Sequence, residues 1–194
     1  MSCQRSFRQG KVDPESFLFL SARYPLPMIS VQDLKIHYGD FVAVDRLTFS
    51  VEKGSVYGLI GPNGAGKTTT IKAIATLIEP TYGEITLDGT SVLHEPEQAR
   101  KMLGYMPDFP PVYDDLRVDE FVELFASAYG ATSEKRNTEV DRCLAATNLE
   151  DKRKVLCKTL SRGMKQRALL AKTLVHDPPV LLLDEPAANL DPKA

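Results

Sequence analysis

The chain has 194 residues, of which 43% are hydrophobic and 26% are charged, a composition typical of globular proteins. That composition excludes a wholly disordered or fibrous protein. Lys and Arg number 24 against 26 Asp and Glu, which gives a formal net charge of -2. This balance excludes an overall positive field for nucleic acid, because neutralising phosphates requires clustered Lys and Arg.

The cysteines indicate the redox compartment, and the lengths of the apolar runs indicate whether the chain can span a membrane. Cys3, Cys143 and Cys157 are odd in number and lack CxxC or His-paired spacing. This pattern favours free thiols in a reducing compartment and predicts no cysteine metal site. The apolar runs are far shorter than the roughly 20 residues that span a bilayer. We therefore expect any link to a membrane to run through a partner.

Residues 1–27 differ from the rest of the chain. They show no sustained periodicity, and their apolar run 17–20 is too short for the core of a signal peptide. We expect a poorly ordered tail there and a regular domain from Met28. A natural start at Met28 is the alternative.

Alternating apolar residues predict strands in the first part of the domain. Between Ile29 and Val51, apolar side chains recur at every second position with a break at Gly39, as in half-buried antiparallel strands. The continuous apolar run 56–60 predicts a strand buried on both faces. A short strand is expected over 83–89.

Helical spacing dominates the second part. It predicts helices over 69–77, 118–129 and 140–147, and a further helix with Ser161 as its N-cap. The run 180–183 then predicts another buried strand. Together these elements predict an α/β domain with a largely parallel central sheet, N-terminal antiparallel strands and an inserted helical block.

The segment 61–68 matches G-x-x-x-x-G-K-[ST] between a predicted strand and a predicted helix. Its glycines let backbone N–H groups approach phosphate oxygens, and the following helix N-terminus favours negative charge. Lys67 is expected to reach the β- and γ-phosphates, and the Thr68 hydroxyl to help hold Mg²⁺. The residues predicted to bind ATP here are Gly61, Pro62, Asn63, Gly64, Ala65, Gly66, Lys67, Thr68 and Thr69.

Two carboxylates follow the last predicted strand. Ligands of open α/β sheets bind at the carboxyl ends of strands, so Asp184 and Glu185 are expected to face the same crevice as the phosphate loop. Asp184 is expected to support Mg²⁺, directly or through water. Glu185 is placed to polarise an attacking water as general base, with Lys67 as the second catalytic residue.

The segment 160–167, LSRGMKQR, resembles the LSGGQ signature of ABC-type ATPases. Tyr38 resembles the aromatic residue that stacks on adenine in that family, and 188–191 resembles its D-loop. The motifs occur in the family's order from about Met28 to the last residue. The resemblance implies a P-loop NTPase core over 28–108 and 156–194, with a helical subdomain over 109–155.

The resemblance also implies how ATP is held. Family members bind two ATP molecules in a head-to-tail dimer, where Ser161 and Gly163 of one subunit would contact the γ-phosphate bound by the other. Tyr38, Val44 and Asp191 are carried over as further nucleotide contacts. The expected cofactors are ATP and Mg²⁺.

Two positions depart from the family pattern. Arg162 and Met164 replace the usual glycine and glutamine of the signature. Asp108 stands where a glutamine is usual, and an ionised carboxylate accepts hydrogen bonds but cannot donate them. We expect Asp108 to join Thr68 and Asp184 in holding Mg²⁺ or its waters.

The resemblance implies an ATP-binding and hydrolysing subunit of a transporter, most similar to ATPases of drug or ABC-2-type exporters. Its expected partners are a separate membrane-spanning permease and a second ATPase subunit, with no nucleic acid, at the cytoplasmic face of the cell membrane. Two alternatives stay open: a soluble ABC-type ATPase outside transport, and an inactive truncated cassette.

The second alternative rests on the end of the chain. His37, His94 and His176 do not fit the family's switch histidine, which follows a further strand. We therefore expect the C-terminal part of the fold to be missing and hydrolysis by this chain to be weak or absent.

Overall fold

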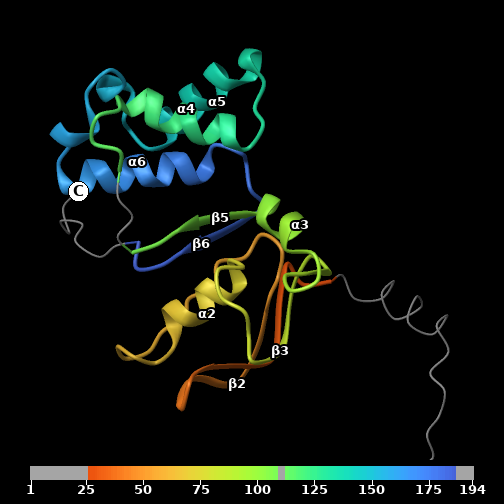
Figure 1. The fold of residues 1–194 in the computed structure, drawn as a ribbon. Coiled ribbons are helices and arrows are strands. Elements are labelled where there is room, and N and C mark those ends of the chain that lie inside the picture. The colour runs from red at the N-terminus through yellow and green to blue at the C-terminus, as the bar shows by residue number, and fades with distance from the viewer. Residues whose placement is uncertain (1–25, 109–111, 187–194) are drawn as a thin grey trace, which may run out of the picture.

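The structure is a computed structural model that describes residues 26–108 and 112–186 (Figure 1). Its strands are β1 (Ile29–Tyr38), β2 (Phe41–Val51), β3 (Tyr82–Leu87), β4 (Thr90–Ser91), β5 (Leu103–Met106) and β6 (Val180–Leu183). Its α-helices are α2 (Lys67–Ile74), α3 (Pro96–Lys101), α4 (Val118–Ala128), α5 (Ser133–Ala146) and α6 (Arg162–Leu174). Two short 3-10 helices are η1 (Glu150–Lys152) and η2 (Cys157–Thr159).

An antiparallel sheet contains the first four strands in the order β2-β1-β3-β4. β1 and β2 form a hairpin that runs from the pair Ile29–Val51 to the pair Tyr38–Phe41. Apolar side chains such as Val31 and Leu34 are buried beneath it. The antiparallel strands predicted from the alternating residues are confirmed.

A second, parallel pair joins β5 and β6 in register from Leu103–Val180 to Met106–Leu183. The strand predicted over 180–183 is confirmed, whereas β5 lies in a stretch where no strand was predicted. Glycine at position 104 permits this packing, because a Cβ there would meet Leu181, Pro178 and the carbonyl of Thr173 at 2.8 Å. The α/β class predicted from the sequence is confirmed.

The strand predicted over 56–60 is wrong. This segment adopts no strand, and the side chains of Val56 and Ile60 are fully exposed. A buried strand requires hydrogen-bonded neighbours, and none of the described strands pairs with this segment. The ring of Tyr57 stacks on Phe49 with centroids 5.1 Å apart, which ties the segment to β2 at one point. The apolar run alone therefore does not place this segment in the core.

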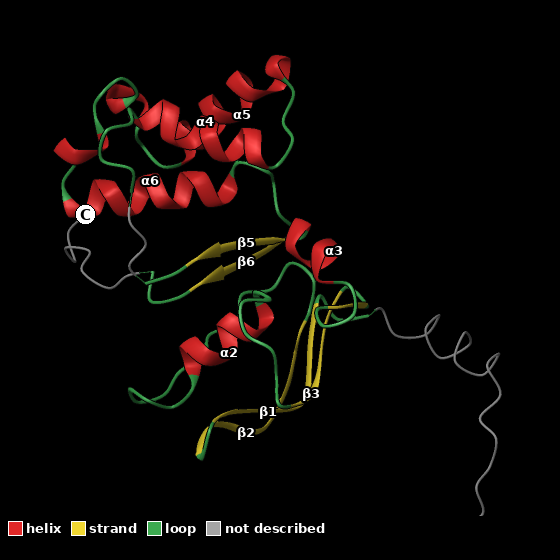
Figure 2. Ribbon diagram, in the orientation of Figure 1, coloured by secondary structure: helices red, strands yellow, loops and turns green. Residues whose placement is uncertain are grey.

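Two clusters of buried side chains lie on either side of the β5–β6 pair. Figure 2 shows α4, α5 and α6 gathered on one side, with α2 and the antiparallel strands on the other. The first cluster joins the antiparallel sheet to α2, α3 and the start of the parallel pair. The second is centred on α4, α5 and α6, with Phe121 and Leu144 among its buried members. These helices turn their apolar stripes toward one another, as their spacing predicts.

The helix ends follow local signals. The helix predicted over 118–129 is α4, and Gly130 follows it with φ +82°. Ser161 caps α6, as predicted, because its hydroxyl accepts a hydrogen bond from the Met164 N–H at 3.3 Å. Cys143 and Cys157 are free and buried, and burial raises the pKa of both thiols. Cys3 lies outside the described residues.

Candidate functional site

The phosphate loop lies close against β2. Gly64 and Gly66 both have φ +82°. A Cβ at Gly66 would approach the Ala43 carbonyl oxygen to 2.5 Å and Val44 Cγ2 to 3.0 Å. Only glycine fits there, and the close approach places Val44 beside the loop. Helix α2 begins immediately afterwards at Lys67, so its unpaired N–H groups lie at the loop.

Lys67 bends back across the loop that precedes it. Its ammonium donates to the carbonyl oxygens of Gly61 at 2.8 Å and Pro62 at 2.9 Å. The Ala65 N–H donates to the Pro62 carbonyl at 3.2 Å and tightens the same turn. A positive charge is thus held inside a loop of backbone amides, an arrangement that attracts a phosphate group.

The phosphate loop meets the end of β6 through one hydrogen bond. Thr68 Oγ1 donates to Asp184 Oδ1 at 3.1 Å, although 116 positions separate the two residues. The backbone of Asp184 is fixed in turn, because its N–H donates to the Met106 carbonyl at 2.9 Å. Asp184 is 3% exposed. The residues predicted from two separate motifs therefore lie in contact.

This pair fits a magnesium ion by its chemistry. A threonine hydroxyl and a carboxylate supply oxygen ligands, which Mg²⁺ prefers, together with phosphate oxygens and waters. The described part of the chain holds no cluster of three or more His, Cys, Asp or Glu side chains suited to a metal. A cation at Thr68 and Asp184 would thus take its other ligands from the nucleotide and water.

Two further carboxylates lie at the same edge. β5 and β6 are parallel, so Asp108 and Glu185 both follow carboxyl ends of strands. Both residues are exposed. No hydrogen bond or ion pair among the described residues joins Asp108 to Thr68 or Asp184. The structure thus brings Asp108 to the predicted edge and leaves its role as a cation ligand a prediction.

The remaining residues predicted to contact the nucleotide belong to several elements. Tyr38 lies at the turn of the β1–β2 hairpin, half exposed and paired with Phe41. Thr69 is half-buried in α2. Ser161 and Gly163 begin α6, which lies in the helical layer and not beside α2 (Figure 1). Asp191 lies outside the described residues.

One contact at the site was not predicted from the sequence. The Gln166 side chain on α6 donates to the Pro186 carbonyl, directly after Glu185. The two residues are 20 positions apart and belong to different elements, so no spacing rule could pair them.

The sequence profile of the family described as ABC transporter matches residues 44–188. The chain belongs to the ABC transporter family. A relative from Burkholderia lata, the Nod factor export ATP-binding protein I, is 39% identical over 170 residues, covering 88% of this chain and 56% of its own length. A probable multidrug ABC transporter ATP-binding protein of Escherichia coli, YbhF, is 36% identical over 85% of this chain and 28% of its own.

Solved structures of the ABC transporter family share the fold. An ATP-binding subunit of an ABC transporter matches with TM-score 0.76 and 34% identity, over 85% of this chain and 69% of its own. A dimeric ATP-binding cassette bound to ADP and Pi matches with TM-score 0.76 and 26% identity, over 86% of this chain and 77% of its own. The chain spans about half the length of its curated Nod factor export relatives.

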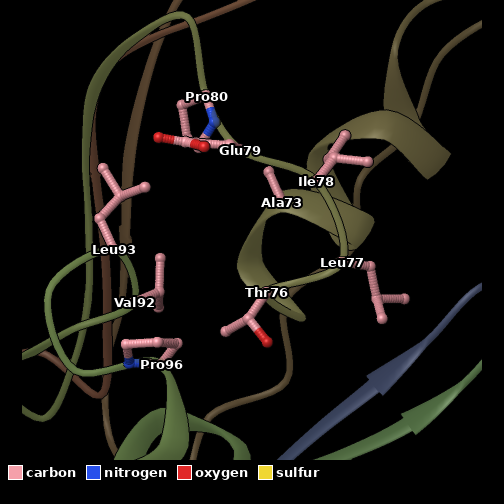
Figure 3. Close-up of a pocket in the computed structure, with 9 residues that line it drawn as sticks. All are labelled: Ala73, Thr76, Leu77, Ile78, Glu79, Pro80, Val92, Leu93 and Pro96. Carbon is pink, nitrogen blue, oxygen red and sulfur yellow. The ribbon is translucent and has the colours of Figure 1, made fainter.

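Two other features of this ABC transporter family member concern its helices and a cavity outside the phosphate loop. None of the helices over 26–108 and 112–186 has the length and apolar character to cross a membrane. A cavity of about 230 Å³ lies beyond the C-terminal end of α2, between Thr76 and Val92 (Figure 3). None of the predicted nucleotide-binding residues that the structure describes lines it. The candidate nucleotide site is thus the exposed phosphate loop and not this cavity.

Proposed function

We propose that this chain binds Mg·ATP at the phosphate loop and hydrolyses it as the ATP-binding subunit of a transporter. The observation that carries the proposal is the hydrogen bond between Thr68 and Asp184, because it joins the phosphate loop to the carboxylate end of a buried strand. The junction supports the proposal because it connects the N-terminal turn of α2, which begins at Lys67, to a buried carboxylate. This combination suits phosphoryl transfer.

The proposed roles follow from the chemistry of each group. The backbone N–H groups of 61–66, apart from Pro62, and the Lys67 ammonium would hold the phosphate oxygens. Thr68, Asp184 and Asp108 would hold Mg²⁺, which neutralises phosphate charge when it is bound. Glu185 would accept a proton from the attacking water, and its exposure leaves it accessible to that water.

We further propose that two subunits close on ATP in a head-to-tail dimer. Ser161 and Gly163 would then contact the nucleotide held by the second subunit. Their place in the helical layer, away from the phosphate loop of the same chain, supports this role (Figure 1). A related solved structure is a dimer bound to ADP and Pi. In the same proposal, Tyr38 and Asp191 also contact the nucleotide.

The proposed partner is a membrane-spanning permease of an exporter, with this chain on the cytoplasmic face. Relatives are named for Nod factor export and multidrug transport, and cbiO1 of Clostridium perfringens is part of a transporter complex. The division into a nucleotide-binding core over 28–108 and 156–194 and a helical subdomain over 109–155 is part of the same proposal.

Nucleotide binding is the first test. A fluorescent ATP analogue should bind the chain in the presence of Mg²⁺. Lys67→Ala should weaken its binding about 10- to 100-fold, because a charge-assisted contact to phosphate is lost. Asp184→Asn should remove most of the effect of Mg²⁺ on affinity. Equal affinities for the wild type and both variants would contradict the proposal.

Hydrolysis is the second test. Release of phosphate in a single turnover should fall by about 10²- to 10⁴-fold in Glu185→Gln, the range of general-base contributions, while the nucleotide still binds. A wild-type chain that binds Mg·ATP and releases no phosphate would favour the inactive cassette. Co-purification with a membrane protein, rather than with ribosomes, would support the transport assignment.

A further inference from the structure

Helix α6 reaches the turn after β6 through one side chain. The Gln166 Nε2 group donates to the Pro186 carbonyl oxygen at 2.5 Å. Pro186 directly follows Glu185, so the bond ends one residue from the proposed general base. Gln166 also lies one helical turn after Ser161 and Arg162, and the backbone of Lys165 bonds to Ser161 at 2.8 Å. The start of α6 and the Glu185 turn are thus directly connected.

The turn at Glu185 adopts an unfavourable backbone conformation. Its φ is +51°, in the left-handed region that L side chains rarely adopt. A following proline restricts the residue before it further toward extended conformations. Such a conformation persists only where surrounding contacts fix it, and it directs the side chain differently from an extended residue. The contacts on each side of Glu185 therefore decide where its carboxylate lies.

One side of the turn is held independently of α6. The Asp184 N–H donates to the Met106 carbonyl at 2.9 Å, and its carboxylate accepts from Thr68 at 3.1 Å. On the other side, Pro186 has no N–H, so its carbonyl is the backbone group that can fix the peptide there. Gln166 binds that carbonyl.

We propose that Gln166 is a positioning residue that holds the backbone at Glu185, and with it the direction of the Glu185 carboxylate. The proposal rests on the proposed function for its catalytic meaning. It implies that a displacement of the start of α6, where Ser161 and Gly163 would meet the second subunit's nucleotide, reaches the general base of the same chain through one hydrogen bond.

The contribution of Gln166 is separable from the stability of α6. The helix is held in the second core by its buried residues Ala168, Leu169 and Ala171, whereas Gln166 is only half-buried. Lys165 fixes the same turn of α6 from another direction through its ion pair with Asp114 at 2.9 Å. Substitution of Gln166 is therefore expected to leave the helix in place.

The test is hydrogen–deuterium exchange of the full chain, read at the amide of Glu185, with the Asp184 amide, which donates to Met106 independently of α6, as the internal reference. Gln166→Met keeps the length of the side chain and removes the donor, and Gln166→Glu replaces the donor with an acceptor. Both should speed exchange at Glu185 about fivefold, as expected for one lost hydrogen bond. The matched control is Gln98→Met on α3, an exposed position, which should leave exchange unchanged.

A second readout separates positioning from binding. Mg·ATP affinity should stay within about twofold of the wild type, whereas single-turnover hydrolysis should fall about tenfold in both Gln166 variants. Unchanged exchange at Glu185 overturns the proposal. So does faster exchange with an unchanged hydrolysis rate. If the wild type releases no phosphate, the hydrolytic function fails, and the exchange result alone decides whether Gln166 holds the turn.

Discussion

Gly66 shows how a single residue can be constrained from two directions. Its φ of +82° disfavours any L side chain, and the Ala43 carbonyl occupies the space a Cβ would need. Gly64 has the same φ of +82°, but a Cβ there would have no neighbouring atom within 4 Å. The two glycines share the same φ, but only Gly66 lies close to β2.

This difference makes a prediction about stability. Gly64→Ala should cost about 1–2 kcal/mol in the free energy of unfolding, the usual penalty of a left-handed conformation. Gly66→Ala should cost about 1–3 kcal/mol more, because the added methyl overlaps the Ala43 carbonyl. Denaturant unfolding of the two variants measures the difference. Equal losses would show that β2 moves away without cost.

At the scale of elements, His176 connects the helical layer to the parallel strands. Its ring stacks on Tyr129, after α4, with centroids 3.6 Å apart. Nε2 lies 2.9 Å from the Leu103 carbonyl and so carries the proton of the neutral ring, whereas Nδ1 is buried without a partner among the described residues. Burial lowers the pKa of His176, against smaller opposing effects of the Leu103 carbonyl and Asp177.

The lowered pKa of His176 predicts a loss of stability in acid. Below the unperturbed imidazole pKa of about 6.5 the unfolded chain binds a proton that the folded chain resists, so stability falls as the pH decreases. His176→Phe keeps a ring for stacking and should reduce the change in thermal midpoint between about pH 7.5 and pH 5.5. His94→Phe, at an exposed histidine, is the control. An unchanged pH dependence in His176→Phe would contradict the prediction.

At the scale of the whole molecule, local patterns predicted more than distant ones. The cap at Ser161 and the helix from Val118 follow from short motifs. The contact of the phosphate loop with Asp184 was expected because strand ends share an edge, but in the structure only Asp184 follows a strand. The strand over 56–60 failed because burial depends on neighbours that an apolar run cannot specify. The contact of Gln166 with Pro186 was missed because it depends on how two elements pack.

The exposed apolar run makes a prediction about association. Val56 and Ile60 are fully exposed, and apolar surface of this kind favours self-association. Replacing both by threonine should reduce light scattering at high protein concentration without lowering the thermal midpoint, since no burial is lost. Leu124→Thr, on the exposed face of α4, is the control. A lower midpoint in the double variant would show that the segment packs in solution.

The β5–β6 pair has a thermodynamic consequence for the molecule. Leu103, Val180 and Leu182 belong to the first buried cluster, whereas Met106 and Leu183 contact the second. Both clusters therefore pack against the β5–β6 pair, so unfolding either cluster removes apolar contacts from the other. Heat should consequently unfold both in a single cooperative transition, in which the calorimetric and van't Hoff enthalpies agree.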